Sequence, residues 1–395
     1  MTTLGRARGA DCAAFFTQGL VFISLTTRLP DVRERWDLGE VALSLILLMM
    51  VVLAGVGSVI AERAARSNDS ALVLRAGLLL MVVAVPCLVL APAFAFFVVG
   101  MAVYGVALGV VDATTNMQAV ALEHRYGRTI LPSFHGMWTV GGIVGSLITL
   151  STSSLSLSWA ALVALVPLTV AFAPFLPRDR GADLPAAATP SVVPWRPLLL
   201  VGAALVLFYM VDTAAATWGP TYLADEFDTP SGLVALATLP YLVASGAMRL
   251  AGDRLAARHG PVALLRSGAL VAFGALGVIV LAPTWPVAVL GFTVLGLGVA
   301  TIAPLSFSAA AVLAGGADLT GAARQARVDA VIARFNQFNY VGALVGSVLT
   351  GLAGAGSLRV GFAVPMVLVL ALVPLAKAFA PAPAPAPPQA GISAQ

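Results

Sequence analysis

Two acidic residues, Asp112 and Asp212, lie inside long apolar runs of this sequence. Thr115 and Asn116 follow Asp112 at a spacing of three and four residues, which puts all three on one face if the run is helical. An ionisable residue in an apolar segment is costly, and within a membrane it is by default a functional residue, such as part of a proton relay. We therefore expect Asp112 first, and Asp212 second, to carry a proton, with a structural hydrogen-bonding role as the alternative for each.

Aromatic, hydroxyl and amide side chains accompany these acids and suit the binding of a polar organic molecule. His135 is a third candidate to carry a proton, although a lone histidine is more often structural. The amides between positions 336 and 339 are unusual in an apolar segment and should face protein or water. The expected substrate-binding residues are Asn116, Thr115, Trp138, Tyr209, Thr213, Trp218, Asn336, Asn339 and Tyr340.

The motifs of enzymes and cofactor sites are missing from the sequence. It contains no nucleophile–base pair, metal-ligand cluster or phosphate-binding loop, and Cys12 and Cys87 fit no metal or redox spacing. We therefore expect no enzymatic activity, no cofactor and no metal.

The composition excludes most classes of soluble protein. Of the 395 residues, 59% are hydrophobic and only 10% are charged, and the mean hydropathy is +0.97. Soluble domains carry about 25% charged residues. The basic residues lie almost entirely in short connecting segments, so the pI of about 9.4 does not indicate nucleic-acid binding. The composition predicts a protein embedded in a lipid bilayer.

The apolar runs predict an all-α membrane protein with twelve transmembrane helices, because a helix needs about 20 apolar residues to cross a bilayer. Breaks between the runs coincide with charges and with turn signals such as Pro283 and Pro286. The expected spans are 12–29, 41–61, 72–91, 94–120, 131–152, 157–176, 197–223, 231–252, 262–282, 286–313, 329–353 and 358–380.

The basic residues predict how the chain is oriented. With the N-terminus inside, the segments outside the membrane on the far side hold only Arg28, Arg33, Arg35 and Arg359, and the rest of the 22 Lys and Arg residues, Arg249 included, fall on the inner side. Short cytoplasmic loops are enriched in Lys and Arg. We therefore expect both termini in the cytoplasm and a location in a bacterial-type inner membrane.

The sequence repeats itself with the same orientation. The segment 134–149 matches 335–350 at seven of sixteen positions. Two parallel six-helix repeats are a plan of secondary transporters, in which the substrate site lies between the halves. We expect an N-terminal half at 1–177, a cytoplasmic linker at 178–196, a C-terminal half at 197–380 and a disordered Pro/Ala tail at 381–395.

Two loop motifs follow the second and eighth expected spans. One runs from Gly246 to Gly260 and contains Asp253 and Arg254, and its weaker counterpart contains Glu62 and Arg63. Both resemble the cytoplasmic loop motif of the major facilitator superfamily. The resemblance covers nearly the whole chain and implies the fold of that superfamily, with these four residues acting as a gate latch rather than in substrate binding.

Within the superfamily, the fourth expected span resembles the fucose permease branch, in which an acid and an asparagine four residues on lie in the same helix of a proton-coupled sugar importer. Asp112 and Asn116 occupy these places here. That branch has an acid in the middle of its first span, whereas this chain has only Asp11, at the inner end. The resemblance implies proton-coupled symport of a small polar, sugar-like solute by alternating access.

Two alternatives to this function stay open at the level of sequence. One is an exporter of an amphipathic metabolite or drug by proton antiport, and the other is a membrane receptor or partner subunit that transports nothing. The expected partners are a small-molecule substrate, protons and the lipid bilayer, with no nucleic acid, and we expect a monomer.

Overall fold

The computed structural model describes residues 3–126, 130–177, 195–315, 331, 335 and 337–380, and this part of the chain is helical, with no strand. Its first elements are α1 (Thr3–Thr26), α2 (Leu29–Trp36), α3 (Glu40–Ser67), α4 (Ser70–Val89), α5 (Phe94–Tyr126), α6 (Leu131–Ser151), η1 (Leu157–Ala164) and α7 (Leu165–Ala171). The later elements are α8 (Trp195–Phe227), η2 (Val234–Ala237), α9 (Leu239–His259), α10 (Pro261–Leu281), α11 (Trp285–Val299), α12 (Ile302–Gly315), α14 (Gln337–Ala353), α15 (Leu358–Val369), α16 (Leu372–Leu375) and η3 (Ala376–Phe379).

Nine helical stretches in the described part of the chain are long and apolar enough to cross a bilayer. The other three expected spans coincide with α6, with η1 and α7 together, and with α14. The apolar stretch at η1 and α7 is shorter than 18 residues, and part of the span expected at 329–353 lies outside the described residues. An all-helical membrane fold is therefore established, and the count of twelve stays a prediction.

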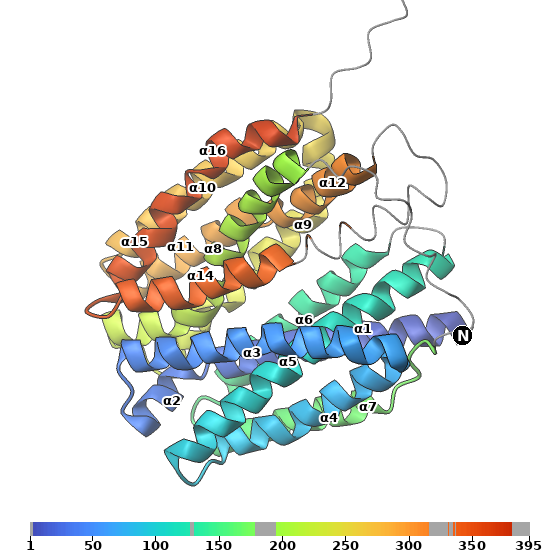
Figure 1. Cartoon of the computed structure of the whole chain (residues 1–395). Coiled ribbons are helices and arrows are strands. Elements are labelled where there is room, and N and C mark those ends of the chain that lie inside the picture. The colour runs from blue at the N-terminus through green and yellow to red at the C-terminus, as the bar shows by residue number, and fades with distance from the viewer. Residues whose placement is uncertain are drawn as a thin grey trace, which may run out of the picture.

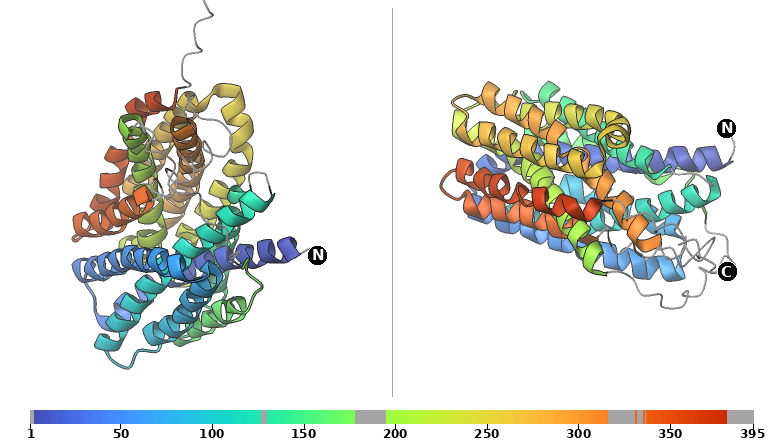
Figure 2. Two further views of the ribbon diagram at one scale, coloured as in Figure 1. Left: turned by 45° about the vertical axis from the view of Figure 1, so that its right-hand side comes forward. Right: turned by 90° about the horizontal axis from the view of Figure 1, so that it is seen from above.

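The helices form two groups that lie side by side (Figure 1). We call α1 to α7 the N-terminal group and α8 to η3 the C-terminal group, and the left view of Figure 2 shows the same separation. In the N-terminal group the most extensive packing joins α1 to α6, α3 to α5 and α4 to α5. In the C-terminal group it joins α8 to α14, α9 to α11 and α10 to α11. These are equivalent pairs under a six-helix repeat, so the packing follows the pattern that the repeated sequence predicts.

Two pairs of glycines explain why α6 packs closely on α1 and why α14 packs closely on α8. A side chain on Gly141 would collide with the backbone of α1, and one on Gly145 would crowd it. In the other group, a side chain on Gly342 or Gly346 would collide in the same way with α8. Small residues four positions apart allow helix backbones to approach closely in membranes. Both glycine pairs therefore act in helix packing, as their spacing predicts.

The two groups touch at the end of the molecule that holds α2, opposite the start of α1 (Figure 1). There Arg33 of α2 forms an ion pair with Asp225 of α8. The loop after α6 lies close to the loop before η2, because a Cβ on Gly232 would lie 3.6 Å from the Cβ of Ser153. We call this region the α2 end.

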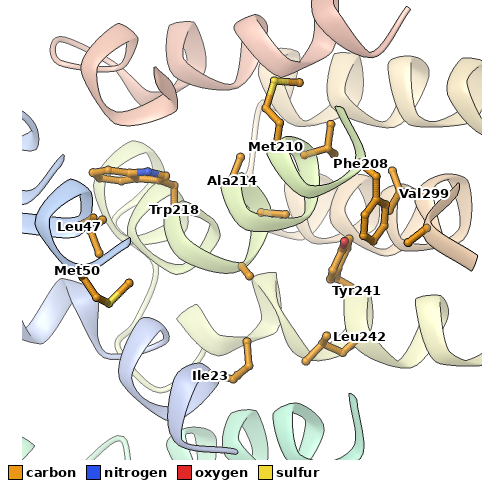
Figure 3. Close-up of a cluster of buried hydrophobic side chains, with 14 of the residues drawn as sticks. Ile23, Leu47, Met50, Phe208, Met210, Ala214, Trp218, Tyr241, Leu242 and Val299 are labelled. Atoms are coloured by element: carbon orange, nitrogen blue, oxygen red, sulfur yellow. The ribbon is translucent and has the colours of Figure 1, made fainter. Parts of the chain in front are cut away.

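Apolar side chains continue the contact between the groups toward the middle of the helices. Figure 3 shows Leu47 and Met50 of α3 near Trp218 of α8, and Ile23 of α1 near Leu242 of α9. All five belong to one buried apolar cluster that draws residues from both groups. The groups are therefore held together at the α2 end mainly by close packing.

Candidate functional site

Asp112 lies near the middle of α5 and accepts a hydrogen bond on each carboxylate oxygen. The side-chain amide of Gln18, in α1, donates to Oδ1 at 3.1 Å. The hydroxyl of Tyr340, in α14, donates to Oδ2. Since α14 belongs to the C-terminal group, this acid links the two groups directly. Asp112 is partly exposed as a residue, and its two hydrogen bonds come from different helical groups.

Asp212 lies near the middle of α8 and accepts a hydrogen bond from the hydroxyl of Tyr241 in α9. Tyr209, one turn earlier on α8, lies within electrostatic range of Asp212 and also of Asp112 in the other group. The structure thus brings the two predicted acids into one polar region between the groups. We call this region the central site.

Arg249 is a member of the central site that the sequence analysis did not identify as a site residue. It was counted among the basic residues of the inner side, and it lies ten residues from either end of α9, three residues before the candidate span Val234–Gly252 ends. Its Nη1 donates to the hydroxyl of Thr139, in α6 of the N-terminal group, at 3.2 Å. The guanidinium also lies within electrostatic range of Asp212 and His135. The signal that could have found it is its position in an apolar run, four residues before the aspartate of the loop motif.

His135 and Trp138 lie on α6, beside α1. The imidazole of His135 packs edge-on against Phe15, with ring centroids 5.2 Å apart. The indole of Trp138 lies 6.3 Å from the ring of Phe22. Both side chains retain exposed surface, and His135 faces the charge of Arg249. These two expected site residues therefore border the central site from the N-terminal group.

Four other expected residues are placed with different roles. Thr115 is buried and donates to backbone carbonyls of its own helix at 2.9 and 3.0 Å, and Asn116 donates to the carbonyl of Asp112 at 2.9 Å. Thr213 and Asn339 are partly exposed. The hydroxyl of Thr115 and one N–H of Asn116 are used within α5, which leaves Thr213 and Asn339 freer to bind a ligand.

Trp218 and Asn336 complete the predicted set. The ring of Trp218 is fully buried, and its Nε1 donates to the carbonyl of Ser347 at 2.7 Å. It also contacts Gly351 at the α2 end, so these contacts favour a packing role over substrate binding. Asn336 lies outside the described residues.

The residues of the loop motifs lie at the far end from α2, and the structure describes them only in part. Arg63 and Arg254 are exposed near the ends of α3 and α9. The side chains of Glu62 and Asp253 lie outside the described part of the chain, so the predicted gate latch stays a prediction. Among the residues that the structure describes, no group of three His, Cys, Asp or Glu side chains is placed to hold a metal ion.

Gln18 and Tyr241 are the two hydrogen-bond donors that the sequence analysis did not find. Each donates directly to one of the predicted acids. Gln18 is a single amide seven residues past Asp11, and it forms no pattern with its neighbours in the sequence. Tyr241 lies in the first turn of α9, and no pattern near it in the sequence distinguishes it from other aromatic residues of the apolar runs.

Comparison with known proteins places this arrangement in a family. The sequence model of the Major Facilitator Superfamily matches residues 12–328. The uncharacterized transporter y4wD of Sinorhizobium fredii is 29% identical over 361 residues, which cover 89% of this chain and 92% of that protein.

Solved structures show the same fold. The nucleoside transporter NupG superimposes with a TM-score of 0.67 at 13% identity, covering 96% of this chain and 98% of that one. The transporter FucP in its outward conformation gives a TM-score of 0.60 at 17% identity, covering 94% and 98%. With the family match over most of its length and an all-helical fold of this kind, the chain belongs to the major facilitator superfamily of membrane transporters.

Proposed function

We propose that this chain moves a small polar organic solute across the membrane by proton-coupled alternating access, with Asp112 as the first proton-carrying group. The observation that carries the proposal is the position of Asp112 between Gln18 of one group and Tyr340 of the other. A proton taken up there acts on the contact between the two groups.

Protonation changes that contact in a definite direction. The ionised carboxylate accepts a hydrogen bond on both oxygens, and hydrogen bonds to a charged group are stronger than neutral ones, by about 1 kcal/mol each. A proton on Asp112 removes the charge and competes for one oxygen. The bond from Tyr340 weakens, and the groups separate more readily midway along their helices. Uptake of a proton thereby favours reorientation of the substrate-loaded protein.

Contacts at the α2 end support the alternating-access part of the proposal. With both termini in the cytoplasm, α2 lies on the outer side of the membrane, and the ion pair between Arg33 and Asp225 closes the outer entrance. The structure then corresponds to a conformation closed to the outside. Opening requires loss of this ion pair and of the apolar contacts behind it.

The proposed transport is tested in proteoliposomes that contain a trapped pH-sensitive dye. Sugars, sugar acids, amino acids and cationic drugs are added outside, and wild type is compared with Asp112→Asn. The matched control is Asp11→Asn, because Asp11 is also a buried acid of the N-terminal group but its carboxylate oxygens have no hydrogen-bond partner. Internal acidification by one solute, lost in Asp112→Asn and kept in Asp11→Asn, is the result we expect.

Other outcomes separate the alternatives. Internal alkalinisation by an added solute identifies proton antiport and export. A signal that is unchanged in Asp112→Asn removes this residue as proton carrier and transfers the role to Asp212 or His135. A solute that binds but moves neither itself nor protons identifies a receptor.

A further inference from the structure

Arg249 is a charged group in an unusual place. It lies at the middle of α9, ten residues from each end, and inside the candidate membrane span Val234–Gly252, three residues before that span ends. A charged side chain inside a membrane span is costly, and it normally pairs with an acid or with backbone carbonyls, or it lines the path of a ligand.

The hydrogen bonds of Arg249 are incomplete. A guanidinium has five N–H donors, and the structure gives it one hydrogen bond, from Nη1 to Thr139. Its Nε is buried without any partner. Within the described ranges it forms no ion pair. The buried Nε carries a desolvation cost while it lacks a partner. Arg249 as a whole is partly exposed, so a ligand that accepts a hydrogen bond from Nε would relieve that cost.

The acids nearby do not supply that partner. Both oxygens of Asp112 accept from Gln18 and Tyr340. Asp212 lies within electrostatic range of Arg249 and in the same helical group, so no movement between groups is needed to pair them. Even so, Asp212 bonds to Tyr241 instead, and Arg249 reaches across to the other group.

Around the guanidinium are groups suited to an anion. Tyr209 and His135 lie within its electrostatic range and keep exposed surface, and each can donate one further hydrogen bond. The planar fork of a guanidinium matches the two oxygens of a carboxylate. A carboxylate held there would touch α9 of one group and α6 of the other.

We propose that Arg249 binds the carboxylate of the transported solute, which makes the substrate an organic acid. This inference rests on the proposed transport function and narrows its substrate class. Thr139 accepts from one donor of the guanidinium, and the carboxylate takes the donors that have no partner.

The test uses purified full-length protein and matched pairs of acid and neutral probes at constant ionic strength. The pairs are D-glucuronate with D-glucose, D-galacturonate with D-galactose, and D-glycerate with glycerol, and binding is read from the rise in Tm with ligand concentration. We expect at least one acid to raise the Tm while its neutral partner does not. Loss of a charged hydrogen bond predicts a Kd at least about tenfold weaker in Arg249→Gln, with Arg249→Lys between the two.

A second variant distinguishes loss of the ligand contact from misfolding of the protein. Thr139→Val removes the only described hydrogen bond of Arg249 and leaves the guanidinium in place. If a carboxylate is its ligand, this variant keeps acid binding or tightens it, whereas Arg249→Gln loses it. The proposal is overturned if a neutral probe binds as well as its acid, if acid binding survives unchanged in Arg249→Gln, or if no acid of the panel binds wild type.

Failure of this inference is distinguishable from failure of the transport proposal. A neutral solute that drives proton uptake through Asp112 leaves the transport proposal intact and overturns the anion site. An acid that is transported in Asp112→Asn but not in Arg249→Gln keeps the anion site and removes the proton role of Asp112.

Discussion

Replacement of Tyr340 by phenylalanine removes one hydroxyl, and with it the hydrogen bond to Asp112 that joins the two helical groups midway along their length. The ring keeps its place in α14. We expect the conformation closed at the α2 end to lose stability relative to one that is open there, because this bond links the groups in the closed conformation.

The change in the free energy of opening follows from the one hydrogen bond that the substitution removes. A hydrogen bond to a charged group is worth about 1.5–3 kcal/mol, whereas hydrogen bonds inside membrane proteins average about 0.6 kcal/mol and reach about 1.7. Asp112 keeps its bond from Gln18 at 3.1 Å, so the loss stays near the upper membrane values, about 1–1.7 kcal/mol. The ratio of open to closed molecules then rises about 5- to 20-fold.

The assay measures how often the α2 end opens. Ser44, near the start of α3, is fully buried and lies against Gly351 of the other group. In protein whose Cys12 and Cys87 are replaced by alanine, a cysteine at position 44 reacts with a polar maleimide only when this end opens. The labelling rate is therefore proportional to the open population, and we expect Tyr340→Phe to raise it about 5- to 20-fold.

Tyr104→Phe is the matched control. Tyr104 lies on the same helix as Asp112 and is buried, and its hydroxyl has no hydrogen-bond partner. Removing that hydroxyl should leave the labelling rate unchanged. Equal labelling rates in Tyr340→Phe and its parent would refute the reasoning, because the hydrogen bond to Asp112 would then not stabilise the closed conformation. An equal rise in Tyr104→Phe would also refute it, because loss of any buried hydroxyl would then have the same effect.

Three other substitutions give further tests. Both carboxylate oxygens of Asp11 are buried without a partner, so Asp11→Leu should be as stable as wild type or more stable, by up to about 1–3 kcal/mol, and a lower Tm would contradict this. Arg33→Ala removes the ion pair to Asp225, which is worth at most about 1 kcal/mol; labelling at position 44 should rise up to about fivefold at low salt and less at high salt, and a rise independent of salt would count against the ion pair. Gly141→Ala should lower the Tm because the new methyl group meets the backbone of α1, whereas Gly136→Ala has open space; equal stability of the two variants would refute the packing role.

The sequence predicts the fold correctly where short stretches of residues determine it. Apolar length marks the spans, and the spacing of Gly141 and Gly145 marks a close helix contact. The 157–176 segment shows the limit of this approach, because it divides into the 3-10 helix η1 and the short α-helix α7 where one transmembrane helix was expected. Composition records that a segment is apolar but not whether it is regular along its length.

The central site was only partly readable, because its contacts join residues far apart in the chain. Asp112 stands out as a single acid in an apolar run, yet its partner Tyr340 lies 228 residues away, and no local spacing indicates that contact. Arg249 was counted only as an inner-side basic residue, because the motif around Asp253 follows it within a few residues at the end of the expected span 231–252. Thr115 and Asn116 share a helix face with Asp112. The spacing that predicts this face does not show that both side chains donate to backbone carbonyls of their own helix.

The central claim is that transport needs the α2 end to open and close, and a disulfide tests it most directly. A Cβ on Gly232 would lie 3.6 Å from the Cβ of Ser153, which is within the usual range for a disulfide, about 3.5–4.5 Å. The Ser153→Cys/Gly232→Cys variant, made without Cys12 and Cys87, should therefore cross-link on oxidation. The account predicts that solute-driven pH change stops in the oxidised proteoliposomes and returns after reduction, while each single-cysteine variant is unaffected. Transport that continues at the same rate in fully cross-linked protein would contradict alternating access through this end.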